Sequence, residues 1–162
     1  MKQSGRVWLE GEVIRYRWPT RVGWMQRVRP RFDEWSLSLD RVCVVGEHTN
    51  ESGPFADDYF MSFAHADETW VDVSRYAEGF DAFASGLADR LQAGLLTGLA
   101  GSTTFASRIL WPETHLDRPM FTYTTRKPAS WWGRVFDLGS NVQTLSPDCL
   151  DAIATSRGDH DA

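Results

Sequence analysis

The first group of side chains that could do chemistry lies between residues 46 and 58, in the stretch GEHTNESGPFADD. It offers His48, Glu51, Asp57 and Asp58, residue types that bind divalent metals. Their spacing fits no HxH, HExxH or EF-hand pattern, and the central NESGP is typical of turns. We therefore expect a polar loop that joins two strands and holds no metal.

The other titratable side chains form no linear motif. Asp67, Glu68 and Asp72 lie near an expected hairpin, where carboxylates usually form a solvated face. The chain has no GxSxG elbow, no Walker loop and no Rossmann glycine run. We predict no catalytic residue and no cofactor, while a site that assembles only in the folded chain would leave no such trace. The four histidines are scattered, at positions 48, 65, 115 and 160.

The two cysteines form no CxxC pair and no disulfide framework. Cys43 lies in an apolar strand pattern and Cys149 in a helical one, whereas a nucleophilic cysteine needs a partly exposed, electropositive setting. We expect both to be small core residues. The start MKQSGRVWLEGE has no apolar signal region, and the longest apolar stretch, LLTGLAG, is too short to cross a bilayer. These features predict a cytoplasmic protein without membrane contact.

The most suggestive binding segment is PASWWG, residues 128–133. Adjacent side chains of an extended segment point in opposite directions, so Trp131 and Trp132 cannot both be buried there. Exposed aromatic residues between polar ones are typical of interfaces. We predict Trp131 and Trp132 to be partner-binding residues, with another protein or a second copy of the chain as the partner. The alternative is a tryptophan lid over the end of a barrel.

Residues 12–32, EVIRYRWPTRVGWMQRVRPRF, hold six arginines and no acid after Glu12. Residues 1–32 carry eight basic and two acidic side chains, or +6, and the remainder carries nine basic and 20 acidic ones, or −11, which gives the net charge of −5. Such a segment is either an anion-binding patch or a hairpin that is balanced by carboxylates of its own chain. The net negative charge favours the second interpretation.

A register for this hairpin follows from one assumption, that WPTR is a four-residue turn joining strands 7–17 and 22–31. Antiparallel pairing then places Glu12 opposite Arg27, Glu10 opposite Arg29 and Arg15 opposite Trp24. The arginines of the hairpin would be mainly structural. We therefore predict no binding to nucleic acid.

The elements that would position these residues are strands in the first half and a helix in the middle. Phe80, Phe83, Leu87 and Leu91 recur at helical spacing and predict an amphipathic helix over 79–97. Ser146 as N-cap and Pro147 at the first position predict a short closing helix, 147–156, before a frayed tail, 157–162. Further strands are expected at 35–39 and 42–46 (a tight hairpin), 58–65 and 68–74 (a second hairpin), 105–111 and 120–125. Residues 134–139 fit either a short strand or an extended segment.

These elements predict one α+β domain, residues 1–156, with a mostly antiparallel, strongly bent sheet or partial barrel. The stretch DDYFMSFAHADETWVDVSRYAEGFDAFASGLADRL, with EWSLSLDRVCVV before it, resembles small bacterial pleckstrin-homology-like domains over about residues 34–95. The resemblance is one of pattern and carries over no functional residue. It implies a bent sheet plugged by a helix and a binding or scaffolding role.

Two classes of function remain open at this point. The first is a non-catalytic module that binds, and neutralises or scaffolds, a basic protein partner, as an immunity protein does; the acidic body and the aromatic segment agree with it. The alternative is a small hydrolase whose carboxylate and histidine residues come together only in the fold. A pocket with two titratable groups within hydrogen-bond reach would favour the hydrolase. A third option is a structural homo-oligomer that pairs through Trp131 and Trp132.

Overall fold

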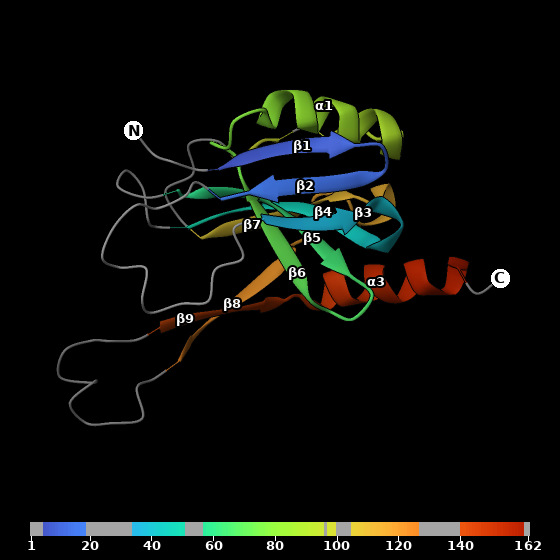
Figure 1. The fold of residues 1–162 in the computed structure, drawn as a ribbon. Coiled ribbons are helices and arrows are strands. Elements are labelled where there is room, and N and C mark those ends of the chain that lie inside the picture. Colours follow the sequence, from blue (N-terminus) through green and yellow to red (C-terminus); the bar gives the residue numbers. More distant parts are fainter. Residues whose placement is uncertain are drawn as a thin grey trace.

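The computed structural model describes residues 5–18, 34–50, 57–95, 97–99, 105–126 and 140–160. Within these ranges the chain forms strands, two α-helices and two single 3-10 turns (Figure 1). The order is β1 (Arg6–Glu10), β2 (Val13–Arg17), β3 (Glu34–Ser38), η2 (Leu39–Arg41), β4 (Val42–Thr49), β5 (Tyr59–His65), β6 (Trp70–Ser74), α1 (Phe80–Leu91), β7 (Ala106–Trp111), η3 (Glu113–His115), β8 (Phe121–Arg126), β9 (Ser140–Leu145) and α3 (Pro147–His160).

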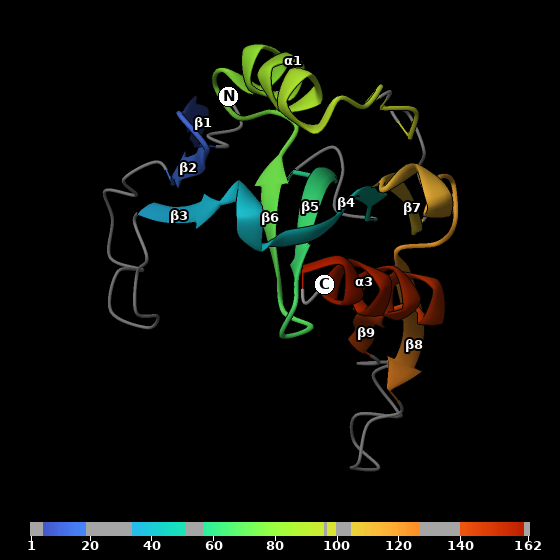
Figure 2. The ribbon, with the colours of Figure 1, turned by 90° about the vertical axis from the view of Figure 1, so that its right-hand side faces the viewer.

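The strands form three antiparallel sheets, with the orders β1-β2-β3, β6-β5-β4-β7 and β8-β9. The α+β class and the antiparallel pairing agree with the sequence prediction. The described strands do not close into a barrel. Helices α1 and α3 lie on opposite sides of the four-stranded sheet (Figures 1 and 2).

Both faces of the four-stranded sheet are buried, so two cores form. Strand β5 shows the alternation, since Phe63 enters the first core and Ala64 the second. The first core lies among this sheet, the three-stranded sheet and α1, and includes Val7, Ile14, Tyr16, Leu37, Met61, Phe63, Val73, Phe80, Phe83 and Leu87. The second core lies among the opposite face, α3 and the β8–β9 hairpin, and includes Cys43, Val44, Ala64, Ile109, Met120, Phe121, Cys149, Ala152 and Ile153.

Helix α1 is shorter than the sequence predicts. Phe80, Phe83 and Leu87 are buried as expected and Leu91 is part-buried, but the helix has 12 residues and ends at Leu91 rather than at 97. Gln92 adopts a left-handed conformation, with φ of 50°, and its N–H bonds to the carbonyls of the last turn. The prediction of one long amphipathic helix is therefore wrong. Leu95 still packs against the first core, but from outside the helix.

Helix α3 is longer than predicted. Ser146 caps it, because its Oγ accepts the Cys149 N–H at 3.1 Å, as the sequence predicts. The helix then continues through residues 157–160, which were expected to be a frayed tail. None of these residues is a proline, and Arg157 lies 4.0 Å from Glu68 of the β5–β6 turn, which ties the last turns to the sheet.

The predicted hairpin of strands 7–17 and 22–31 is wrong. The chain instead turns at Gly11, where φ is 61°, so that β1 pairs with β2 and Glu10 lies opposite Val13. The other edge of β2 pairs with β3. With both edges of β2 occupied, Arg15 cannot lie opposite Trp24 in a ladder. Residues 19–33, with four of the six arginines, lie outside the described residues.

The predicted tight hairpin of 35–39 with 42–46 is also wrong. The 3-10 turn Leu39–Arg41 carries the chain from the three-stranded sheet into the four-stranded one, so β3 pairs with β2 while β4 pairs with β5 and β7. The hairpin of 58–65 with 68–74 is confirmed as β5 and β6. The segment 134–139 lies outside the described residues, and β9, at 140–145, was not predicted.

Candidate functional site

Strand β4 carries two buried polar residues side by side, Glu47 and His48. The sequence predicted a polar loop here, but both residues belong to strand β4. Glu47 is 0% exposed and His48 is 4% exposed. Successive residues of a strand face opposite sides of the sheet. Glu47 follows Val45 of the first core by two positions and pairs with Met61, whereas His48 contacts Phe121 of the second core. Each residue is the centre of a separate polar cluster.

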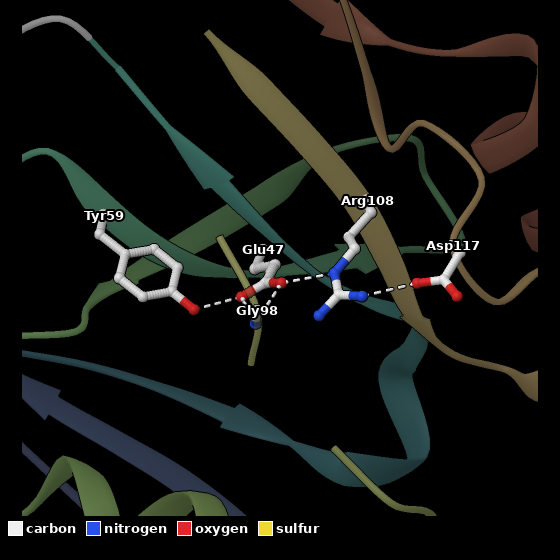
Figure 3. Close-up of polar contacts among 5 residues, drawn as sticks. All are labelled: Glu47, Tyr59, Gly98, Arg108 and Asp117. Atoms are coloured by element: carbon white, nitrogen blue, oxygen red, sulfur yellow. Dashed lines mark hydrogen bonds and ion pairs between the residues drawn. The ribbon is translucent and has the colours of Figure 1, made fainter. Parts of the chain in front are cut away.

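The first cluster surrounds the Glu47 carboxylate (Figure 3). Arg108 Nε donates to Oε1 at 2.6 Å, and the Gly98 N–H donates to the same oxygen at 2.9 Å. The Tyr59 hydroxyl donates to Oε2. Arg108 Nη1 also donates to Asp117 at 2.7 Å. The carboxylate thus joins β4, β5, β7 and the 97–99 segment.

This arrangement suits a structural role. Burial, and then the Glu47 carboxylate, raise the pKa of Tyr59, and the same carboxylate raises the pKa of Arg108, so both partners stay protonated donors. A Cβ on Gly98 would lie 2.4 Å from Arg108 Nη2, so a larger residue there would require the Arg108 guanidinium to shift. Because three donors already occupy the enclosed Glu47 carboxylate, it is poorly placed to act as a general base.

The second cluster is a chain of three side chains across β4, β5 and β6, which we call the His48 relay: His48, Ser62 and Asp72. His48 Nδ1 lies 2.9 Å from Ser62 Oγ, and Ser62 donates to Asp72 Oδ1 at 2.6 Å. The His48 ring stacks on Phe60 at 5.1 Å and meets Phe121 edge to face at 5.2 Å. Burial lowers the pKa of His48, against the opposing charge of Asp72, and burial raises the pKa of Asp72, against His48.

The order of the groups in the relay differs from that of a catalytic triad. In a triad the histidine lies between the acid and the serine and takes the serine proton. Here the serine lies in the middle and its hydroxyl donates a hydrogen bond to Asp72. Ser62 is also completely buried. The relay therefore brings together the carboxylate and the histidine without the arrangement of an activated nucleophile.

The first residue of the β8–β9 hairpin, Phe121, packs against the His48 relay. Phe121 contacts His48 and also Trp70, at 5.3 Å, and its N–H donates to Ser107 Oγ at 3.0 Å. One step further along, Tyr123 pairs with Gln143 across the hairpin. Tyr123 Oη and Gln143 Nε2 are both buried; Gln143 Nε2 has no hydrogen-bond partner among the described residues, and Ser107 is the polar neighbour of Tyr123 Oη. Burial raises the pKa of Tyr123 to about 12.

The predicted partner-binding residues belong to the segment that joins β8 to β9. Trp131 and Trp132 lie outside the described residues, as does Glu51. Asp58 accepts a 2.7 Å hydrogen bond from the Tyr76 hydroxyl, and Asp67 accepts one from Thr69. Asp72 belongs to the relay and not to the solvated face expected of it. Among the described residues, no three His, Cys, Asp or Glu side chains converge as a metal site.

The remaining candidates lie in the core or in ion pairs. Cys43 and Cys149 are both buried in the second core, which confirms that prediction. His65 Nδ1 lies 3.1 Å from Thr69 Oγ1, and His115 Nε2 lies 3.0 Å from Asp151 of α3. Four members of the polar clusters were not predicted from the sequence: Glu47, Tyr59, Ser62 and Arg108.

Comparison with known proteins adds no assignment: no family model, no curated protein and no solved structure matches this chain. The pleckstrin-homology-like resemblance therefore stays a prediction. Within the described ranges, neither helix has the length and apolar content needed to cross a bilayer.

Proposed function

We propose that this chain is a non-catalytic module that binds a basic protein partner, with its acidic body supplying the attraction and the β8–β9 hairpin, with Trp131 and Trp132 in its connection, supplying the contact. The observation that carries the proposal is the pairing of arginines with carboxylates of the same chain. Eight of the ten arginines of the described residues lie beside carboxylates of the same chain, and the acidic side chains of these residues outnumber the basic ones.

The charge count supports this. The described residues include 18 acidic and 10 basic side chains, a balance of −8. Eight of the basic side chains lie within 4.0 Å of a carboxylate. The pairs are Arg6–Glu78, Arg15–Glu10, Arg17–Glu34, Arg75–Asp81, Arg90–Glu12, Arg108–Glu47, Arg118–Asp148 and Arg157–Glu68. A surface with this balance accelerates encounter with a positively charged partner and repels an anionic one.

The β8–β9 hairpin supports a contact role. Its root is fixed in the second core by Phe121 and Leu145, and from there the two strands run away from the other sheets (Figures 1 and 2). Thr122, Thr124 and Thr144 are exposed. A two-stranded hairpin on its own is marginally stable in water, and a partner that covers it would remove that weakness.

The two polar clusters favour this function over a hydrolase. The Glu47 carboxylate is enclosed and its oxygens are occupied by protein donors. Ser62 of the relay is buried, and its hydroxyl donates a hydrogen bond to Asp72. Neither cluster offers a nucleophile beside a free base, which is the arrangement that hydrolysis requires.

Photo-crosslinking in the native cell tests the proposal. A photoreactive phenylalanine analogue replaces Trp131 or Trp132, and the matched control replaces Trp18, which is 42% exposed but directly follows β2. We expect positions 131 and 132 to give a covalent adduct with one basic protein, and we expect the adduct to weaken as salt is added, because screening reduces the attraction.

Three results would contradict the proposal. An adduct with a second copy of this chain alone would indicate a homo-oligomer. An adduct yield no higher than at Trp18 would indicate that the connection contacts no partner. Adducts that persist unchanged at high salt would remove the electrostatic part of the proposal.

A further inference from the structure

The β8–β9 hairpin is a two-stranded sheet, so each of its strands has an outer edge. In an antiparallel ladder, pairs that exchange both backbone hydrogen bonds alternate with pairs whose N–H and C=O groups point away from the other strand. The Ser146 N–H donates to the Met120 carbonyl at 2.9 Å, which extends the β8–β9 register by one residue and marks a hydrogen-bonded pair. Counting from this pair, the residues of β9 whose backbone groups point away from β8 are Asn141, Gln143 and Leu145.

The two outer edges of the hairpin differ in their surroundings. On the edge of β8, the Phe121 N–H donates to Ser107 Oγ at 3.0 Å, and this hydroxyl lies 3.4 Å from the Phe121 carbonyl, so β7 covers the beginning of that edge. On the edge of β9, none of the outward-facing residues has a backbone partner among the described residues. Thr144 of β9 is exposed, and the hairpin runs away from the other sheets (Figure 1). The edge of β9 is therefore available to another strand.

The sequence of β9 also permits such pairing. Natural sheets usually protect their edge strands with charged residues or proline. Strand β9, SNVQTL, contains neither. Each of the other strands at a described sheet edge carries a charge: Arg6 and Glu10 in β1, Glu34 in β3, Asp72 in β6, Arg108 in β7 and Arg126 in β8. A strand that adds to β9 therefore meets no charged side chain of β9.

One side chain of β9 lacks a partner of its own. Gln143 Nε2 is buried and has no hydrogen-bond acceptor among the described residues. A buried donor that is left without an acceptor is costly. The glutamine amide carries both donors and an acceptor, so a second glutamine amide beside it would supply what Nε2 needs.

A second copy of β9, running antiparallel to the first, brings such an amide to this place. Outward-facing residues of one strand must lie opposite outward-facing residues of the other. The register that sets Gln143 opposite Gln143 of the second copy also sets Asn141 opposite Leu145, so every outward-facing residue of β9 is paired. The two Gln143 residues then lie at the two-fold axis, with their Cα atoms about 5.5 Å apart.

The neighbouring registers are less favourable. A shift by two residues in one direction places Asn141 opposite Pro147, which has no N–H to donate. A shift by two in the other direction moves Leu145 opposite residue 139, outside β9. A shift by one residue would set outward-facing groups opposite groups already used in the hairpin. The ends of β9 thus select the register that is centred on Gln143.

We propose that β9 is the contact of a symmetric dimer, in which the outer edges of two β9 strands pair antiparallel about Gln143 and join the two hairpins into a four-stranded sheet. Such a contact uses the same surface of both copies, as two-fold dimers do. Pairing with further strands also stabilises a hairpin that is marginal on its own. The dimer is a property of the chain alone and does not rest on the function proposed above.

Analytical ultracentrifugation of the full chain over a range of concentrations measures the association. We expect a reversible monomer–dimer equilibrium, and a weak one, because the edge of one strand is a small contact. The contact contains no ion pair and each copy has a net charge of −5, so added salt should strengthen the dimer by screening the repulsion. Binding of the basic partner should respond to salt in the opposite direction.

Amide hydrogen exchange, followed residue by residue by NMR, locates the contact. The reporter is the Gln143 N–H, which points to the outer edge of β9, and the reference is the Tyr123 N–H, which lies opposite it and points to the outer edge of β8. As the protein concentration rises, protection of Gln143 should increase in step with the fraction of dimer. Protection of Tyr123 should change by less than about twofold.

A matched pair of proline variants tests which edge is used. Asn141 and Thr125 lie opposite each other, and their N–H groups point to the outer edges of β9 and β8. A proline at either position therefore removes no hydrogen bond of the hairpin. Asn141→Pro should weaken the dimer at least about tenfold, because one backbone hydrogen bond is lost in each copy. Thr125→Pro should change the dissociation constant by less than about twofold.

A second pair of variants uses charge. Gln143→Glu places two carboxylates directly opposite each other at the axis and should also weaken the dimer at neutral pH. Thr122→Glu adds the same charge at an exposed position of β8 and is its control. If Asn141→Pro does not fold, the Gln143→Glu pair and the exchange of Gln143 decide the question.

Four outcomes would overturn the dimer. They are a chain that stays monomeric up to about 1 mM, Gln143 protection that stays constant while a dimer forms, equal weakening by each variant and its control, and a dimer that salt weakens. Failure of positions 131 and 132 to capture a basic protein would refute the proposed function and leave the dimer standing. A chain that is monomeric but is captured by such a protein would do the reverse.

Discussion

Glu47 and Arg108 lie directly opposite each other in the β4–β7 ladder, and their side chains meet at 2.6 Å on the face of the sheet where Glu47 is completely buried. Arg108 itself is 25% exposed and continues to Asp117. A buried carboxylate is therefore held by a cation that reaches it from the edge of the sheet.

Replacing Arg108 should destabilise the fold strongly. Arg108→Met keeps much of the aliphatic stem but leaves the Glu47 carboxylate buried without its cation, which costs about 3–5 kcal/mol for a fully buried pair and somewhat less here because Arg108 is partly solvated. Asp117→Asn is the matched control. Asp117 is 63% exposed, so its loss should cost less than about 1 kcal/mol. Urea unfolding of both variants measures the difference, and equal midpoints would contradict the role given to Glu47.

Gly79 should tolerate no side chain. Its φ is 84°, and a Cβ would lie 2.7 Å from the Val7 carbonyl oxygen, which faces the start of α1. We expect Gly79→Ala to lower the free energy of unfolding by about 1–3 kcal/mol, from the left-handed backbone and the clash together. Gly158, in α3, has no atom within 4 Å of such a Cβ, so Gly158→Ala should stabilise by up to about 1 kcal/mol. Thermal unfolding of the pair should shift in opposite directions.

Asp72 is a carboxylate whose replacement should not lower the free energy of unfolding at neutral pH. Burial raises its pKa in the folded protein above the unfolded value, so the folded state binds the proton more tightly and loses stability as pH rises through the folded pKa. Above the folded pKa the ionised Asp72 is therefore a cost. Asp72→Asn keeps an oxygen that can accept from Ser62 and removes the charge, so the variant should be at least as stable as the wild type at pH 7. Its advantage should shrink as pH falls below the folded pKa, and a variant that is clearly less stable at pH 7 would refute this.

The sequence could predict the local elements whose signals lie within one segment. The spacing of Phe80, Phe83 and Leu87 located the buried face of α1, and Ser146 with Pro147 located the start of α3. The alternation of β5 and β6 gave their pairing. In each case the residues that decide the structure lie within one helix or one hairpin.

The candidate site could not be predicted in the same way, because its parts are distant in sequence. Glu47 and Arg108 are 61 residues apart, and no local pattern marks a glutamate that will be buried. Its polar neighbours His48 and Thr49 made the end of β4 look like a loop, whereas the ladders with β5 and β7 keep it a strand. The turn at Gly11 could have been predicted, since a glycine between two alternating runs favours a turn.

The thiols should be unreactive in the folded protein. Burial, and then the neighbouring Cys43, raise the pKa of Cys149 to about 12, and both residues lie in the second core. A thiol, rather than the reactive thiolate, is therefore present at neutral pH. An aromatic disulfide reagent should label neither cysteine of the native protein and both after unfolding in urea. Fast labelling of Cys149 in the native state would contradict its burial in the second core.

The last prediction concerns the arginine-rich segment 12–32. Two of its arginines are described, and both are engaged: Arg15 Nε donates to Glu10 at 2.6 Å, and Arg17 Nη2 donates to Glu34 at 3.0 Å. Their guanidinium groups also lie beside carboxylates that would repel a phosphate, and the chain as a whole is at −5. Binding to nucleic acid depends on releasing counterions from several phosphates at once, which needs unpaired cations along a track.

We therefore expect no mobility shift of duplex DNA or single-stranded RNA at physiological salt. The same assay at low salt should show at most weak binding that vanishes as salt is added, because the net charge opposes it. The informative variant is Arg27→Ala with Arg29→Ala, whose residues lie outside the described part of the chain. Tight, salt-dependent binding by the wild type that this double substitution abolishes would show that these two arginines, unlike Arg15 and Arg17, face phosphate and not the chain's own acids.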